Sequence, residues 1–156
     1  MHFRVPSTDI DTAARTGEIV KGHVTLGSLR VRHDRLLFEG LLGAERSGAG
    51  GTDDPVQLSL ARLRQLAAHE VGHTLGFAHN FAASTRDRAS VMDYPAPLVT
   101  IAADGGLDVA HAYTDGIGAW DVAAARWAYA EFAPGADEAA QLDRLVRETL
   151  EGGLVF

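Results

Sequence analysis

A segment near the middle of the chain constrains the fold most, because it places two histidines four residues apart on a predicted helix. Apolar residues recur there at helical spacing on one face: Leu60, Leu63, Ala67 and Val71. The pattern predicts a helix from Val56 to about Leu75, ended by Gly76. Residues four apart on a helix lie about 40° apart in projection, so His69 and His73 can aim ring nitrogens at one point. We expect the apolar face to pack and the other face to coordinate a metal ion.

A third histidine follows where the predicted helix stops. On a continued helix, His79 would lie about 9 Å further along the axis than His73. Gly76 can take a positive φ, end the helix and turn the chain back, so that His79 reaches the same point. Three neutral imidazoles with an open fourth position are typical of a catalytic zinc site, whereas a structural site is closed by four protein ligands.

Glu70 follows the first of these histidines and projects beside the ligand pair. A zinc hydrolase needs a general base there, because zinc lowers the pKa of its bound water to about 7 and a carboxylate can accept the proton. Glu70 would pass that proton to a leaving amine, while zinc polarises the scissile carbonyl and stabilises the oxyanion. The sequence therefore predicts a zinc metallopeptidase with one catalytic ion held by His69, His73 and His79.

The eleven residues His69–His79 carry the pattern His-Glu-x-x-His-x-x-Gly-x-x-His. The chain thereby resembles the metzincin clan of zinc endopeptidases. That clan has a Met-turn, a tight turn that places a methionine beneath the metal, and the segment SVMDY at 90–94 is similar to it. By this resemblance Met92, the only methionine besides Met1, is the Met-turn methionine.

Tyr94 lies two residues after Met92, an offset at which astacin-like and serralysin-like metzincins have a tyrosine. The resemblance implies that Tyr94 ligates zinc in the resting enzyme and swings away to stabilise the oxyanion. The alternative is a tyrosine that only packs beside Pro95.

Longer stretches resemble a narrower group, the uncharacterised bacterial zinc-dependent metalloproteases of large, multidomain architecture. The similar stretches are RTGEI, GHVTLGSLRVRHDRLL, HEVGHTLGFAHNFAAS and SVMDYPAP. The resemblance implies that residues 1–156 are one metallopeptidase catalytic domain, cut from a longer chain whose other domains are its partners. It also implies a secreted or periplasmic location, although the N-terminus lacks the apolar core of a signal peptide.

The fold class expected from these patterns is α+β and mostly helical, with a metzincin-like core and a reduced N-terminal sheet. Only 68 residues precede the motif, whereas metzincin domains usually carry a mixed sheet of several strands there. The expected elements are a strand at 18–26, a hairpin at 98–109, and helices at 28–42, 116–132 and 137–151. Residues 1–17 are polar and turn-rich, and the loop at 43–55 is expected to be a flexible connection.

Packing faces follow from the same periodicity. The expected inward stripe of the first helix is Leu29, His33, Leu36, Leu37, Gly40 and Leu41. Ser28 is expected to cap this helix, and Trp120 and Trp127 are expected in the core. Asp93 is expected to bond local backbone. The remaining histidines lack ligand spacing: His2, His23, His33 and His111.

Metzincin substrates lie extended along an edge strand and pair with its backbone, which here implies the strand at Glu18–Leu26. The same resemblance implies that the lower wall of the cleft comes from Pro95–Thr100 and from the helix around Trp120.

Composition narrows the choice of cofactor and partner. The chain has no cysteine, so histidine and carboxylate must hold any metal. Its net charge of −7 argues against nucleic acid as the main partner, and no apolar run is long enough to cross a bilayer. The expected partner is therefore a peptide or protein substrate. Two alternatives stay open: a zinc-bound interaction module without catalysis, and a core that needs neighbouring domains for activity. Glu70 favours catalysis, because a degraded site often loses its base first.

Overall fold

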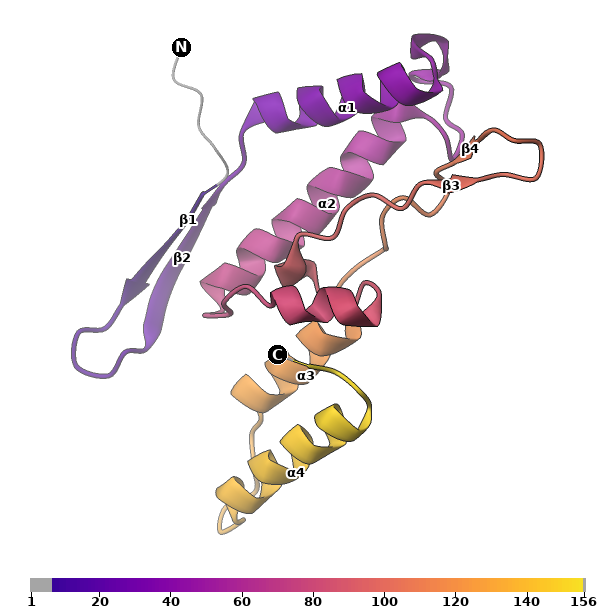
Figure 1. Cartoon of the computed structure of the whole chain (residues 1–156). Coiled ribbons are helices and arrows are strands. Elements are labelled where there is room, and N and C mark those ends of the chain that lie inside the picture. The colour runs from indigo at the N-terminus through magenta and orange to yellow at the C-terminus, as the bar shows by residue number, and fades with distance from the viewer. Residues whose placement is uncertain (1–6, 156) are drawn as a thin grey trace. The chain divides into compact units, whose positions relative to one another are not determined.

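The computed structural model describes residues 7–155, and the chain falls into two compact units. The first unit contains Met1–Gly76 and Ala96–Gly116, and the second contains Phe77–Pro95 and Ile117–Phe156. The architecture is α+β and mostly helical, with small two-stranded sheets, as the sequence predicts (Figure 1). Every helix within residues 7–155 is too short or too polar to traverse a lipid bilayer.

The first unit opens with a β-hairpin formed by β1 (Ser7–Thr12) and β2 (Ile19–Thr25). The strands are antiparallel, and Thr8 lies opposite Val24. β2 confirms the strand expected at 18–26. The sequence does not predict β1, because STDIDT offers a single apolar residue. Cross-strand pairing with β2, rather than a hydrophobic pattern of its own, makes this segment a strand.

The hairpin packs against the helix that carries the motif, α2 (Pro55–Thr74). Gly22 of β2 makes the close approach possible. A Cβ atom at this position would lie only 2.5 Å from the Cβ atom of Thr74. Any side chain at Gly22 would therefore push the hairpin away from the last turn of α2.

The helix α1 (Ser28–Leu42) has the predicted bounds, but its inward face differs from the prediction. Phe38 is its buried residue. Three leucines of the expected stripe are exposed: Leu36, Leu37 and Leu41. An aromatic ring buries more apolar area than any one leucine, so Phe38 turns inward and the stripe prediction is wrong. The expected cap is also wrong, because Gly27 is the N-cap and Ser28 is already helical, with no side-chain cap bond.

Phe38 belongs to the core of the first unit. The buried cluster consists of Phe38, Leu58, Val109 and Ala112. Tyr113 packs against it, with its ring edge-to-face with that of Phe38 and the ring centroids 6.1 Å apart. Residues 96–116 thus complete a core that begins with α1 and α2, which converge at the loop joining them (Figure 1).

One carboxylate organises the glycine-rich loop before α2. Asp54 is buried and accepts hydrogen bonds from the N–H groups of Gly48 and Gly50, both at 2.9 Å. The bond from Gly48 is the main cause that lowers the pKa of Asp54 below its usual value, and the other backbone donors add to it. Asp54 also accepts from the Val56 N–H at 2.8 Å and so caps α2. The loop, which includes a short 3₁₀ turn at Ala44–Arg46, is thereby tied to the helix that follows.

The buried face of α2 is not the predicted one. It carries Leu58, Ser59, Arg62, Gln65, Leu66, His69, Glu70 and Gly72. Val71, which was expected to pack, is 49% exposed. The histidine His69 therefore lies on the packed side of the helix rather than opposite it. Several polar members of this face have hydrogen-bond partners, which a pattern built on apolar residues does not register.

The first unit also contains the short hairpin predicted at 98–109, formed by β3 (Thr100–Ile101) and β4 (Leu107–Asp108). The Leu98 N–H donates to the Ala112 carbonyl at 3.0 Å. This bond joins the base of the hairpin to the buried cluster.

The second unit contains α3 (Ala119–Ala128) and α4 (Glu138–Glu151), which pack against each other (Figure 1). α4 begins as predicted, with Asp137 as its N-cap. α3 is shorter than the predicted 116–132: its start is set by a cap at Gly118, and it ends at Ala128.

Trp127 on α3 is 50% exposed, so its placement in the core is wrong. The side chains of α3 that share a hollow with α4 are Ala119, Val122, Ala123 and Arg126. Trp127 is not among the residues that line this hollow.

Replacement of Phe38 by alanine is expected to lower the free energy of unfolding by about 3–5 kcal/mol, because it empties the centre of the buried cluster. Leu37→Ala, on the exposed side of the same helix, should change it by less than about 1 kcal/mol. Urea unfolding of the metal-free proteins, followed by circular dichroism, measures both. Equal losses would contradict the observed orientation of α1.

Candidate metal centre

The last two turns of α2 bring His69 and His73 together. Their Nε2 atoms lie 3.1 Å apart, and their ring centroids lie 4.6 Å apart with the planes at a right angle. Zinc binds imidazole nitrogen at about 2.0–2.1 Å in tetrahedral geometry, which puts two such nitrogens about 3.3 Å from each other. The pair therefore has the spacing of two ligands of one ion, and the four-residue interval on a helix produces it.

The chain reverses directly after α2. Leu75 is the C-cap residue, and the Gly76 N–H donates to the His73 carbonyl at 2.9 Å. Gly76 has a φ of +87°, a conformation that glycine adopts freely and that strains residues with a Cβ atom. Three residues further on the chain reaches His79.

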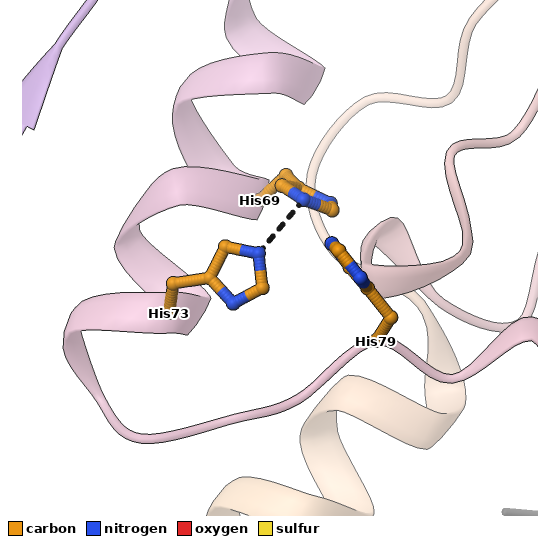
Figure 2. Close-up of side chains that lie close together, drawn as sticks. All are labelled: His69, His73 and His79. Carbon is orange, nitrogen blue, oxygen red and sulfur yellow. Dashed lines mark hydrogen bonds between the residues drawn. The ribbon is translucent and has the colours of Figure 1, made fainter. Parts of the chain in front are cut away.

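His69, His73 and His79 form a group that could hold a metal ion (Figure 2). Each ring offers one nitrogen, and these nitrogens lie within 4.8 Å of one another. His69 is buried, His73 is partly buried and His79 is exposed. Within residues 7–155, no other group of histidine and acidic side chains converges in this way. A set of neutral imidazoles suits zinc, so the donors present fit that ion.

Glu70, the predicted general base, is a buried residue of the same helix. Its Oε2 atom accepts a hydrogen bond of 2.5 Å from the hydroxyl group of Thr8 in β1. The sequence does not reveal this partner, because the two residues are 62 positions apart and β1 itself is not predicted.

The segment predicted as the Met-turn forms a 3₁₀ turn at Val91–Asp93. Met92 is almost completely buried, and its N–H donates to the Ser90 hydroxyl at 2.9 Å. The Met92 carbonyl accepts a hydrogen bond of 3.1 Å from the N–H of Asn80. Since Asn80 directly follows His79, this bond joins the turn to the residue beside the third histidine.

A buried carboxylate holds the turn from the other side. Asp121 of α3 accepts from the Ser90 hydroxyl at 2.6 Å. Its second oxygen accepts from the N–H groups of Val91 at 2.9 Å and Gly118 at 2.7 Å. The start of α3 is thus fastened to the 3₁₀ turn at Val91–Asp93. The sequence did not single out Asp121, because an aspartate in the first turn of a helix is common.

A model of the family described as Met-zincin matches residues 51–156, more than half of the chain. The chain belongs to the Met-zincin family. No curated protein and no solved structure matches it. Family membership and the three-histidine group together indicate a zinc-dependent metallopeptidase.

In this Met-zincin, Tyr94 follows the 3₁₀ turn with φ 56° and ψ 52°, a left-handed conformation that is uncommon outside glycine. Its ring lies beside that of His79, with the centroids 4.8 Å apart. Such backbone conformations cost about 1–3 kcal/mol and cluster at functional sites.

Phe81 is a neighbour of the site that the sequence did not identify. Its side chain is 62% exposed, and its ring centroid lies 5.2 Å from that of His79 and 6.5 Å from that of Tyr94. Phe81 begins the 3₁₀ turn Phe81–Arg86, in the irregular stretch after the motif, where no periodicity marks functional positions. The Met-zincin thus presents two aromatic rings beside its exposed histidine.

The other residues considered from the sequence take ordinary places. The histidines His23, His33 and His111 are exposed, and His2 lies outside the described residues. Asp93 accepts a hydrogen bond from the Ser84 hydroxyl rather than from local backbone, which corrects the expected partner. Trp120 is partly buried.

Zinc is expected to raise the melting temperature of the metal-free Met-zincin, because an ion held by ligands from separate turns binds the folded chain best. At a zinc concentration a hundredfold above Kd, the free energy of unfolding should rise by about 2.7 kcal/mol. His79→Ala should lose most of this gain and most of the bound zinc, whereas His33→Ala should keep both. Calorimetry with metal analysis measures this, and equal shifts in the two variants would contradict the ligand assignment.

Proposed function

We propose that this Met-zincin is a zinc-dependent endopeptidase in which His69, His73 and His79 hold one zinc ion and Glu70 is the general base. The observation that carries the proposal is the convergence of three imidazole nitrogens within 4.8 Å of one another. Three histidine ligands leave the fourth position of a tetrahedral ion for water or substrate, as in catalytic zinc sites.

Bound zinc would supply Lewis-acid activation of a water molecule and of the scissile carbonyl. Glu70 accepts the proton that the water gives up as it attacks and returns this proton to the nitrogen of the leaving amine. The side chain of Glu70 is buried, which limits the solvent that competes for its carboxylate. The hydrogen bond from Thr8 leaves the second carboxylate oxygen available for the reaction.

Tyr94 is proposed to be a displaceable zinc ligand in the resting enzyme, which would swing away during attack and donate a hydrogen bond to the oxyanion. Two observations support this role. Its ring lies beside that of His79, and its side chain is half-exposed, which leaves room for a change of rotamer.

An extended peptide is proposed to pair with the backbone of β2, a mode that gives affinity with little sequence specificity. β1 bonds to one edge of β2, and no strand within residues 7–155 pairs with its other edge.

The segments around 15–37, 69–84 and 90–97 resemble bacterial multidomain metalloproteases. This resemblance supports a further proposal about the larger protein to which the chain belongs. The chain would be the catalytic core of a larger, exported multidomain protease. Neighbouring domains would then act as its partners in binding the substrate.

Glu70→Gln is expected to lower kcat at least about 100-fold while the protein keeps its zinc, because the amide preserves the shape of the side chain but cannot accept the proton. A mixed peptide library analysed by mass spectrometry, with and without a chelator, measures the cleavage. Chelation should abolish cleavage by the wild-type chain. Equal cleavage by Glu70→Gln would contradict the role of Glu70, and zinc binding without any cleavage by the wild type would favour a non-catalytic interaction module.

Tyr94→Phe is expected to lower kcat by about 100-fold with little change in KM, because an oxyanion donor acts in the transition state. Steady-state kinetics on a peptide identified in the library measures both constants, and metal analysis verifies zinc content. An unchanged kcat would remove Tyr94 from the mechanism.

A further inference from the structure

The contact between Thr8 and Glu70 joins the N-terminal hairpin to the proposed general base. The Thr8 hydroxyl oxygen lies 2.5 Å from Oε2 of Glu70 and 3.4 Å from the carbonyl oxygen of the same residue. Glu70 is 5% exposed, so this contact forms where little water can replace it. A hydrogen bond to a carboxylate in such surroundings is stronger than one between neutral groups.

The architecture of the first unit explains how a strand hydroxyl reaches this carboxylate. Gly22 of β2 lies against Thr74 in the last turn of α2, and Glu70 lies one helical turn earlier. The antiparallel register places Ile10 opposite Gly22 and Thr8 opposite Val24, two residues further along the hairpin. The hairpin therefore lies alongside the last turns of α2, and the contact of Gly22 with Thr74 fixes the position of Thr8.

We propose that Thr8 is a positioning residue that holds the Glu70 carboxylate in its reactive orientation, an inference that rests on the proposed peptidase function. A glutamate side chain has several rotatable bonds, and a general base acts only when its oxygen is within about 2.6–3.2 Å of the proton it accepts. The Thr8 hydroxyl holds one carboxylate oxygen and leaves the other free to accept that proton. A displacement of about 1 Å at a reacting group can cost about a hundredfold in rate.

The family match does not assign this role, because it covers residues 51–156 and Thr8 lies before them. A purely structural role is the competing explanation, in which the bond only attaches the hairpin to α2. The two explanations differ in what they predict for kcat at a temperature where all variants are folded.

The test compares three variants of the zinc-loaded chain: Thr8→Val, Thr8→Ser and Thr12→Val. Valine keeps the shape of threonine and removes the hydroxyl, while serine keeps the hydroxyl. Thr12 is an exposed residue of the same strand and provides the matched control. Thr8→Val should lower kcat by about tenfold to a hundredfold with KM and zinc content unchanged, whereas Thr8→Ser and Thr12→Val should stay within about threefold of the wild type.

A second measurement, on the metal-free protein, is independent of activity. Thr8→Val should lower the melting temperature in the wild-type background and much less in a Glu70→Ala background, where the acceptor is already missing. Equal losses in both backgrounds would overturn the contact.

The outcomes separate this inference from the function on which it rests. Thr8→Val with the kcat of the wild type would overturn the positioning role while the proposed peptidase stands. A wild-type chain that binds zinc but cleaves no peptide would overturn the proposed function and the positioning role together, even if the stability coupling is present.

Discussion

The pitch of α2 is the constraint on which the metal centre depends. Two imidazole nitrogens lie 3.1 Å apart because their residues are separated by one helical turn. This spacing survives only while the last turns of the helix stay intact, and both ends of α2 are held. Asp54 caps its start, and the β1–β2 hairpin covers its final turn through the close contact of Gly22 with Thr74. The hairpin, although small, is thus part of the support of α2 and of the two histidines on it.

Local features of the site could be predicted from the sequence, and distant ones could not. The interval between His69 and His73 and the turn at Gly76 are set by helix geometry and by the freedom of one glycine, which act over a few residues. A hydrogen-bond partner that lies far along the chain leaves no such pattern in the local sequence. Thr8 has no apolar pattern around it, and Asp121 resembles an ordinary first-turn aspartate. The helix α1 shows the same difference. Its bounds could be predicted from the sequence. Which of its sides faces inward depends on which side chain best fills a core that residues 96–116 complete.

Three buried carboxylates carry much of the organisation of this chain. Each lies in surroundings where a charge without hydrogen bonds would be costly, and each has donors. Asp54 is bonded to the loop before α2, Glu70 to the hairpin, and Asp121 to the 3₁₀ turn at Val91–Asp93. Polar residues form these buried contacts. A prediction that sought buried positions only among apolar residues therefore placed the buried face of α2 on the wrong side. The side of α2 that packs is the side that carries His69 and Glu70.

The bonding of Asp121 has a consequence for the residues that this position can hold. Its two oxygens accept from one hydroxyl and two backbone N–H groups, so every partner is a donor. Asparagine has nearly the same outline but only one acceptor oxygen, so its NH₂ group would face either the two backbone N–H groups or the Ser90 hydroxyl, which would then have to accept instead of donate. Glutamate would carry the same charge on a side chain one carbon longer, which would move its oxygens away from these donors. Of the three side chains, aspartate alone accepts all three hydrogen bonds in the directions observed.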